Sequence, residues 1–494
     1  MLLLGIDIGT SSVKVSVVDG QTQRPLASAG YPDTEAPIIR LQPGWAEQDP
    51  ADWWERFLMA YRKLLAANSF DASAIGAIGI AYQMHGLVLV DKNGAVLRPS
   101  IIWCDSRAVP YGDKANCALG ADYCLAHYLN APGNFTAAKL AWVKENEPSV
   151  YEQVAKVMLP GDYIAFRMTG AVTASASSLS EGIFWDFTNA SPADTLMEYF
   201  GFDAGLLPAV QPVFSTHGGL RPEIAALLQC KAGIPVSYKA GDQPNNALSL
   251  AVTEPGELAA TAGTSGVIYA VSDKLGFDPL SRVNSFAHVN HTAADPRIGI
   301  LLCINGAGIL YSWAKRQWAP DLSYNALNAL AAQAPPGSNG LSVLPFGNGA
   351  ERILENKQPG VVFDGIDLNQ HSQADLFRGL QEGIAFSFRY GLDIMRSNGL
   401  QPTKIRAGYA NLFQSDVFLQ SFVGATGVPV SLYQTDGSTG AALGAGIGAG
   451  FYTTPQEAFS RQEEIRTCTP AHAPALEEAY QRWLGLLQTS IKNV

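Results

Sequence analysis

Cysteine is scarce in this chain, which has six among 494 residues. No two of them form a CxxC pair, and the seven positions that separate Cys117 from Cys124 are poor spacing for a zinc site. Six cysteines are also too few to build a scaffold held by disulfides. We therefore expect reduced thiols and a cytoplasmic protein.

Positive charge and long apolar runs are also lacking. Lys and Arg number 33 against 44 Asp and Glu, a net charge of −11, whereas a protein that binds nucleic acid usually shows the opposite balance or a basic run. No apolar stretch reaches the roughly 18 residues that span a bilayer. The apolar residues 1–4 lead into Gly5-Ile6-Asp7 without a basic flank and are typical of a first strand, not of a signal peptide. We expect neither a nucleic-acid nor a membrane partner.

Apolar residues make up 47% of the chain, which predicts a packed globule, and the length fits two or three domains. Short β-rich runs alternate with longer helical patterns, which indicates an α/β architecture. Strands are predicted at residues 2–7, 13–19, 75–81 and 87–91. Helices are predicted from residue 50, where a proline begins the first turn, and over residues 476–491.

An internal repeat is the most informative feature of the sequence. Residues 9–19 align with residues 263–273 at an offset of 254, and six of the eleven positions are identical. The offset is close to half the chain, as a duplicated fold requires. We therefore predict two lobes of similar fold, each opening with a β-hairpin.

The tip of each predicted hairpin carries the same three residues. Gly-Thr-Ser offers backbone N–H groups with little side chain in the way and two hydroxyls, and both kinds of group suit phosphate oxygens. A single copy would be an ordinary turn. Two copies in equivalent places could hold a triphosphate from both sides of a cleft. The predicted phosphate-binding residues are Gly9, Thr10, Ser11, Gly263, Thr264 and Ser265.

The two copies differ just before the tip, where the first has Asp7 and the second has Thr261. Mg²⁺ usually keeps several waters and takes one or two protein carboxylates. The difference therefore predicts that Asp7 holds a hydrated Mg²⁺ beside the phosphates.

Asp242 follows the apolar run Ile234-Pro235-Val236 and should lie just past a strand end. Ligands of open α/β sheets bind at that edge. A carboxylate there can accept the proton of a hydroxyl group during phosphoryl transfer. It can equally be a helix N-cap, because Asp is favoured in that position, and the residues alone leave the two readings even.

Three further segments have both a structural and a functional interpretation. Residues 82–86 contain Gln83 and His85, which suit a polyhydroxylated ligand, although a lone His is more often structural. Trp103 could stack on the apolar face of a sugar or lie in the core. The small-residue helix predicted from residue 436 could pack closely on a sheet or approach a flat nucleotide base.

Several motifs together resemble the FGGY carbohydrate kinases over residues 3 to about 450. The two hairpin tips resemble the phosphate motifs of that family, and Gln83-Met84-His85-Gly86 matches the sugar-contact motif of one subgroup. Asn134 and Ala350 depart from the usual residues of their blocks. The other matching segments are Trp45-Ala46-Glu47-Gln48-Asp49-Pro50, Trp103-Cys104-Asp105-Ser106-Arg107, Thr136-Ala137-Ala138-Lys139-Leu140-Ala141-Trp142 and Leu344-Pro345-Phe346-Gly347-Asn348-Gly349-Ala350-Glu351-Arg352.

The resemblance implies a two-lobed, actin-like (ribonuclease H-like) ATPase fold with duplicated lobes around a central cleft. The implied units are an N-terminal lobe at 1–248, a C-terminal lobe at 249–452, and a terminal loop and helix at 453–494 packed on the second lobe. The implied activity transfers phosphate from Mg-ATP to the terminal hydroxyl of a ketose, with D-xylulose as the leading acceptor. A homodimer is expected, because family members are often dimers.

The resemblance also implies a role for each motif residue. Asp242 falls where the catalytic base of the family lies, Thr10 and Thr264 would bind phosphates, and the adenosine site would include Gly408 and Asn411. The segment at 407–411 lacks the glycine triplet that many relatives carry. The implied sugar-binding residues are Gln83, Met84, His85, Trp103, Asp242 and Gln243.

Two alternatives stay open at this point. One is the same chemistry on another acceptor, such as ribulose, sedoheptulose or glycerol, because a methylol group more or less changes binding only modestly. The other is a non-catalytic nucleotide switch on the same fold. A pseudoenzyme would be expected to lose Asp7, Asp242 or a hydroxyl-bearing tip, and all of them are present.

Overall fold

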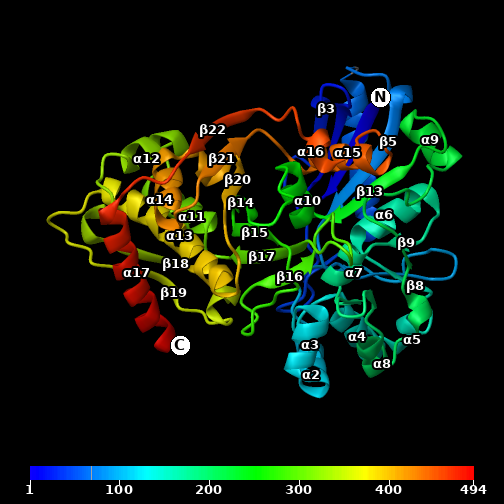
Figure 1. Cartoon of the computed structure of the whole chain (residues 1–494), viewed down its shortest axis with the longest axis horizontal. Helices are drawn as coiled ribbons and strands as arrows, with labels where there is room; N and C mark the ends of the chain where they lie inside the picture. The colour runs from blue at the N-terminus through cyan, green and yellow to red at the C-terminus, as the bar shows by residue number, and fades with distance from the viewer. Residues whose placement is uncertain (68, 494) are drawn as a thin grey trace.

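The chain opens with the predicted hairpin, formed by β1 (Leu2–Ile8) and β2 (Val13–Asp19). The computed structural model describes residues 1–67 and 69–493, which form two α/β lobes that lie side by side (Figure 1). Three more strands complete the first sheet, in the order β13-β5-β1-β2-β3. They are β3 (Arg24–Tyr31), β5 (Ile75–Tyr82) and β13 (Val236–Gly241).

The second sheet has the order β16-β17-β15-β14-β20-β21-β22. Its strands are β14 (Glu257–Ala262), β15 (Gly266–Ser272), β16 (Asn284–Ala287), β17 (Ile298–Ile304), β20 (Lys404–Gly408), β21 (Val430–Tyr433) and β22 (Glu464–Cys468). The hairpin β14–β15 is antiparallel, and β20 and β21 extend the sheet in parallel from β14. The first sheet has the same arrangement, with β5 and β13 parallel to β1 and β3 antiparallel to β2. The repeat in the sequence therefore corresponds to a repeated sheet.

Helices and short strands fill the spaces around and between the two sheets. In the first half of the chain the helices are α1 (Pro50–Ala66), α2 (Val109–Leu119), α3 (Ala121–Tyr128), α4 (Thr136–Asn146), α5 (Pro148–Tyr151), α6 (Pro160–Thr169), α7 (Ala176–Glu181), α8 (Asp194–Phe200), α9 (Pro222–Leu228) and α10 (Asp242–Ser249). In the second half they are α11 (Gly308–Trp318), α12 (Tyr324–Ala331), α13 (Gln373–Ser397), α14 (Asp416–Thr426), α15 (Gly437–Gly448), α16 (Pro455–Ala458) and α17 (Pro474–Lys492).

The remaining regular structure is short. The strands are β4 (Glu47–Gln48), β6 (Val88–Val90), β7 (Ser100–Ile101), β8 (Lys156–Met158), β9 (Thr173–Ala174), β10 (Trp185–Asp186), β11 (Ser191–Pro192), β12 (Ala209–Val210), β18 (Ser342–Phe346) and β19 (Gly360–Asp364). Single turns of 3-10 helix are η1 (Ala72–Ala74), η2 (Ala204–Leu206), η3 (Ser338–Gly340), η4 (Arg352–Leu354) and η5 (Asn411–Gln414). Within residues 1–67 and 69–493, no helix combines the length and the apolar character that a membrane span needs.

Helix α15 belongs to the last quarter of the chain but lies on the first sheet, against β1, β5 and β13 (Figure 1). The approach is close: a Cβ added at Gly5 would lie 1.8 Å from the backbone oxygen of Ser438, and one added at Gly79 would lie 1.9 Å from that of Ala441. The close packing predicted for this small-residue helix is therefore present. Its N-terminus also reaches Asp7, because a Cβ added at Gly437 would lie 2.4 Å from the Oδ2 atom of that carboxylate.

The chain stays on the first lobe for a few residues after α15. The Tyr452 hydroxyl donates to the carbonyl of Gly20 at 2.6 Å, and Arg24 pairs with Glu463. Only then do β22 and α17 join the second lobe, where the Trp483 Nε1–H donates to the carbonyl of Val343 at 2.8 Å. The predicted unit boundaries at 248 and 452 stay predictions.

Candidate active site

A cavity of about 560 Å³ lies between the two lobes and is lined by both. It brings together seven of the fifteen site residues that the sequence predicted. The first lobe contributes Thr10, Met84, His85, Trp103, Asp242 and Gln243, and the second contributes Ser265, Asn284, Cys303, Asn305 and Arg352. The hairpin tips and Asp242, far apart in sequence, therefore meet at one space.

Asp242 is the first residue of α10, directly after β13 ends at Gly241. Gly241 is the N-cap of that helix, so the carboxylate of Asp242 is not its capping group. Burial, together with the negative charge of Asp7, raises the pKa of Asp242 to about 7. A carboxylate with a pKa near neutrality can both accept and hold a proton at physiological pH.

Asp7 lies near the carboxyl end of β1, beside the N-terminus of α15. Burial raises its pKa to about 6; Lys14 opposes this shift and Asp436 adds to it. The described residues contain no group of three or more His, Cys, Asp or Glu side chains that could hold a metal. One or two carboxylates with room for water fit Mg²⁺, which keeps much of its hydration shell, so the Mg²⁺ site predicted at Asp7 is chemically compatible with these residues.

His85 is held in an unusual backbone conformation, with φ at 63°. Its carbonyl accepts hydrogen bonds from Lys139 Nζ at 2.8 Å and from Thr136 Oγ1 at 3.3 Å. Its Nδ1 lies 2.8 Å from the backbone oxygen of Glu181. A carbonyl only accepts, so Nδ1 carries the proton. Burial and the charge of Lys139 lower the pKa of His85 to about 3, which leaves Nε2 unprotonated and able to accept from a hydroxyl group.

Trp103 and Gln83 both meet Thr10 at the first hairpin tip. Trp103 is 51% exposed, so it is not a core residue, and its Nε1–H donates to Thr10 Oγ1 at 3.0 Å. Gln83 is buried behind the cavity wall, where it accepts from Thr10 Oγ1 at 3.2 Å and donates to Gln48 at 2.9 Å. Gln83 thus positions the hydroxyl of Thr10, whereas direct contact between Gln83 and a sugar stays a prediction.

The charged residues of the two tryptophan motifs form one network at this wall, and Asp105 also lines the cavity. Asp105 is fully buried and accepts from the Ala46 N–H at 2.6 Å and from Arg107 at 2.7 Å. Arg107 also donates to Glu47 at 2.7 Å and lies 3.7 Å from the ring centre of Trp45. The two motifs are therefore one cluster, which fixes the loop that carries Trp103.

A second cavity, of about 500 Å³, lies on the other side of the second hairpin tip. Gly263, Thr264 and Asn411 line it, while Gly408 lies at the end of β20 and does not. The carbonyls of Gly263 and Thr264 accept from the N–H groups of Gly308 and Ile309 at 3.0 and 2.9 Å, which fixes the tip against the start of α11. The tip therefore separates the two cavities, with Ser265 lining one and Thr264 the other.

Some residues of the two cavities carried no role in the sequence interpretation. Arg352 ends the matched block at 344–352, which gave it a signal but no function. Tyr311 and Arg316 line the second cavity from α11, and helix spacing alone does not separate them from surface or core positions. Glu181 is buried beside Gly241 and Met84, and no motif marks it.

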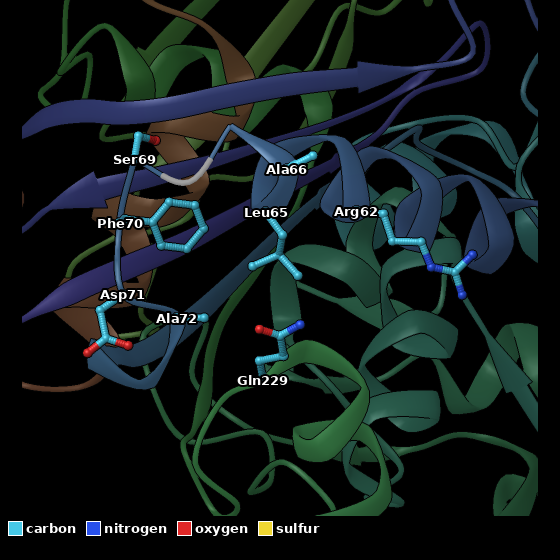
Figure 2. Close-up of a pocket in the computed structure, with 8 residues that line it drawn as sticks. All are labelled: Arg62, Leu65, Ala66, Ser69, Phe70, Asp71, Ala72 and Gln229. Carbon is cyan, nitrogen blue, oxygen red and sulfur yellow. The ribbon is translucent and has the colours of Figure 1, made fainter.

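A third cavity, of about 900 Å³, lies away from these residues, at the end of α1 (Figure 2). Leu65, Phe70 and Gln229 face its centre, and the side chains of Arg62 and Asp71 lie on opposite sides of it. None of the residues predicted to bind sugar, nucleotide or metal lines this cavity.

Known proteins resemble this chain over nearly its whole length. Residues 2–249 match the N-terminal domain, and residues 258–451 the C-terminal domain, of the FGGY family of carbohydrate kinases. The chain is 30% identical to the xylulose kinase of Escherichia coli (strain K12) over 97% of its length and 96% of that protein. It is 31% identical to the xylulose kinase of Klebsiella pneumoniae over 90% and 88%.

Solved structures show the same fold. The xylulose kinase of Rhodospirillum rubrum superposes with a TM-score of 0.87 at 26% identity, over 99% of both chains. Plasmodium falciparum glycerol kinase with ADP superposes with a TM-score of 0.88 over 99% of this chain and 98% of that one, and at 17% identity it shows the fold alone. The two-lobed, actin-like fold class predicted from the sequence is confirmed.

Proposed function

Because the chain belongs to the FGGY family of carbohydrate kinases, which use ATP as co-substrate, we propose that its acceptor is D-xylulose and its product D-xylulose 5-phosphate. The names of the two curated relatives support this choice of sugar. Met84 and His85 match the sugar-contact motif of one subgroup. Both line the inter-lobe cavity, where the proposed sugar would bind.

The observation that carries the proposal is the pair of cavities on either side of the second hairpin tip. The nucleotide would occupy the cavity lined by Gly263, Thr264 and Asn411, and the sugar the cavity lined by His85 and Asp242. A triphosphate that runs past the tip would then present its terminal phosphate to the sugar. The hydroxyls and N–H groups at residues 9–11 and 263–265 would bind the phosphate oxygens.

In the proposed reaction Asp242 is the general base. Its carboxylate takes the proton from the terminal hydroxyl of the sugar as that oxygen forms a bond to the γ-phosphorus. The bond from the γ-phosphorus to the oxygen it shares with the β-phosphate breaks, and ADP leaves. The pKa of about 7 lets Asp242 hold the proton until it passes to solvent.

Asp7 would hold Mg²⁺ through water, and the ion would supply positive charge to the phosphates. Asp7 lies near enough to Asp242 for its negative charge to raise the pKa of Asp242. The charge of Asp436 raises the pKa of Asp7 in the same way. Two neighbouring carboxylates of like charge favour a bound cation. Such an ion would lower the pKa of Asp7 and keep this carboxylate charged.

An assay of ADP release across a panel of acceptors tests the proposal. We expect sugar-stimulated release that is greatest with D-xylulose, lower with ribulose and sedoheptulose, and lost in Asp242→Asn. A preference for glycerol or a seven-carbon sugar would refute the choice of substrate. Release that no sugar stimulates would instead favour the non-catalytic nucleotide switch.

The homodimer and the cytoplasmic location expected from the sequence complete the proposal. Light scattering on the purified chain tests the dimer directly, with a mass near 105 kDa expected because one chain is 52.6 kDa.

A further inference from the structure

Arg352 faces the sugar cavity from the second lobe. It begins η4 and lines the inter-lobe cavity together with His85, Cys303 and Asn305. Its charge acts on both lobes, since it helps to lower the pKa of His85 and is itself influenced by Cys303. The guanidinium therefore lies close enough to His85 to influence it across the cavity that both residues line.

This guanidinium has few partners in the protein. Its one hydrogen bond runs from Nη1 to the backbone oxygen of Ser281 at 3.3 Å, and it forms no ion pair with any residue in the described part of the chain. Two fully packed arginines, in contrast, are matched by carboxylates: Arg107 pairs with Asp105 and Glu47, and Arg378 with Glu382. A guanidinium has five N–H donors, so most of those of Arg352 are available to a ligand.

The neighbouring carboxylate does not neutralise Arg352. Glu351 uses both oxygens to accept from the backbone N–H groups of Asn305 and Gly306, each at 2.9 Å. The Glu351 N–H in turn donates to the carbonyl of Lys357 at 3.1 Å. These bonds fix the loop and leave the charge of Arg352 directed to the cavity. The guanidinium is only partly buried and keeps unpaired donors at the cavity, which favours a role in binding.

The chemistry of the acceptor indicates what Arg352 could bind. A 2-ketopentose closes its five-membered ring through O5, so O5 is free to receive a phosphate only in the open-chain form. That form exposes a carbonyl oxygen at C2, which accepts hydrogen bonds and donates none. His85 Nε2 and Asp242 are acceptors on the same cavity, and the amides of Asn305 and Gln243 are both donors and acceptors. Arg352 is a donor only and so matches a keto oxygen.

We propose that Arg352 binds the C2 carbonyl of the open-chain ketose and thereby selects ketoses over the corresponding polyols. This inference rests on the proposed function and deepens it, since it assigns a residue of the second lobe to substrate specificity. With Arg352 at the C2 carbonyl and Asp242 at the terminal hydroxyl, the sugar would contact both lobes directly.

The test compares substrates that differ only at C2. Reduction of D-xylulose at this carbon gives xylitol and D-arabitol, which keep the terminal hydroxyl but lack the carbonyl. In Arg352→Met we expect kcat/KM for D-xylulose to fall by about 30- to 300-fold, mainly through KM, while kcat/KM for the polyols changes by less than about threefold. Arg352→Lys keeps a positively charged donor but loses the planar, two-pronged guanidinium. Its preference for D-xylulose over the polyols should be intermediate.

Arg282→Met is the matched control. Arg282 lies one residue from Ser281, pairs with Asp278 at 2.7 Å and does not line the cavity. Its loss should lower the Tm and leave the ratio of ketose to polyol activity unchanged. If Arg352→Met does not fold, as judged by its Tm, Arg352→Lys carries the test.

The outcomes separate the two proposals. Suppose that the wild type prefers ketoses. If Arg352→Met then lowers kcat/KM equally for ketose and polyol, or leaves the ratio of the two unchanged, the role of Arg352 is overturned and the proposed function stays intact. A wild type that phosphorylates the polyols as efficiently as D-xylulose would also overturn the role of Arg352, because there would be no selection to explain. A wild type that phosphorylates neither would overturn the proposed function itself.

Discussion

Asp242 has the pKa and the position that a base for a sugar hydroxyl needs. Its pKa is raised because the carboxylate is buried and lies near Asp7. Both effects come from the tertiary structure, since Asp7 is on β1 and Asp242 follows β13. The same surroundings that make the carboxylate a good base make its charged form costly in the folded state.

The first prediction concerns the pH dependence of this residue. Only the ionised carboxylate accepts a proton, and its pKa is raised to about 7, so kcat/KM for the sugar should fall about tenfold per pH unit below pH 7. Where Mg²⁺ is limiting, protonation of Asp7 near pH 6 should steepen the fall. A pH–rate profile from pH 5 to 9 at two Mg²⁺ concentrations measures both effects.

Asp242→Asn is the control for this prediction. It should abolish sugar-stimulated turnover, yet raise the Tm at pH 8 by about 2–5 °C, because the raised pKa means that the ionised form destabilises the fold above pH 7. A flat profile down to pH 5, or an Asn variant that stays active, would contradict the assignment.

Residues with a short local signature were predictable from the sequence, and residues that act through tertiary contacts were not. Thr10, Met84, His85 and Asp242, each marked by a short motif, line the inter-lobe cavity, and their roles there stay predictions. Gln83 shares the motif of His85, but it points behind the wall because its amide bonds to Gln48 and Thr10. The direction of a side chain at a strand end depends on such partners, which adjacent sequence does not reveal.

At the scale of elements, α15 decides how the two lobes are joined. It packs on the first sheet, where glycines on β1 and β5 leave no room for a side chain. The sequence predicts a small-residue helix at this place. It does not say which sheet receives it, because chain order would have assigned the helix to the second lobe.

The second prediction tests this packing. In Gly5→Ala the new Cβ would lie 1.8 Å from the Ser438 oxygen, and neither backbone can move easily, so we expect a loss of about 3 kcal/mol of stability. Gly485→Ala is the matched control, since Gly485 is exposed in the interior of α17 with no atom within 4 Å of a new Cβ. The free energy of unfolding of Gly485→Ala should rise by up to about 1 kcal/mol. Thermal unfolding measures both, and a neutral Gly5→Ala would show that the close approach is not required.

A second junction between the lobes involves the edge strand β16. Asn130 donates to the carbonyl of Ser285 at 2.6 Å and accepts from its N–H at 3.0 Å. Ser177 donates to the carbonyl of Ala287 at 2.8 Å, and Ser180 accepts from the Ala287 N–H at 2.9 Å. Side chains of the first lobe thus replace a neighbouring strand on the free edge of the second sheet.

For the whole molecule, the internal repeat predicted the duplicated sheets, because residues 9–19 and 263–273 form the tip and second strand of hairpins that occupy equivalent places in them. The β16 junction had no such signal. Asn130, Ser177 and Ser180 are ordinary polar residues in sequence, and only the fold brings them to a strand more than a hundred residues away. Repeats report on topology, whereas contacts between lobes depend on single polar side chains.

The last prediction concerns closure of the lobes. The inter-lobe cavity is lined by both lobes, and excluding water from it would limit wasteful hydrolysis of ATP. The radius of gyration from small-angle scattering should therefore fall when sugar and a non-hydrolysable ATP analogue are both saturating, and less with either alone.

The four buried bonds at β16 should hold this edge in place during closure. Asn130→Ala leaves two backbone groups of Ser285 unpaired, so it should weaken closure and raise sugar-independent ATP hydrolysis, whereas Ser460→Ala, on the surface, should do neither. Scattering that does not change with both ligands would refute closure.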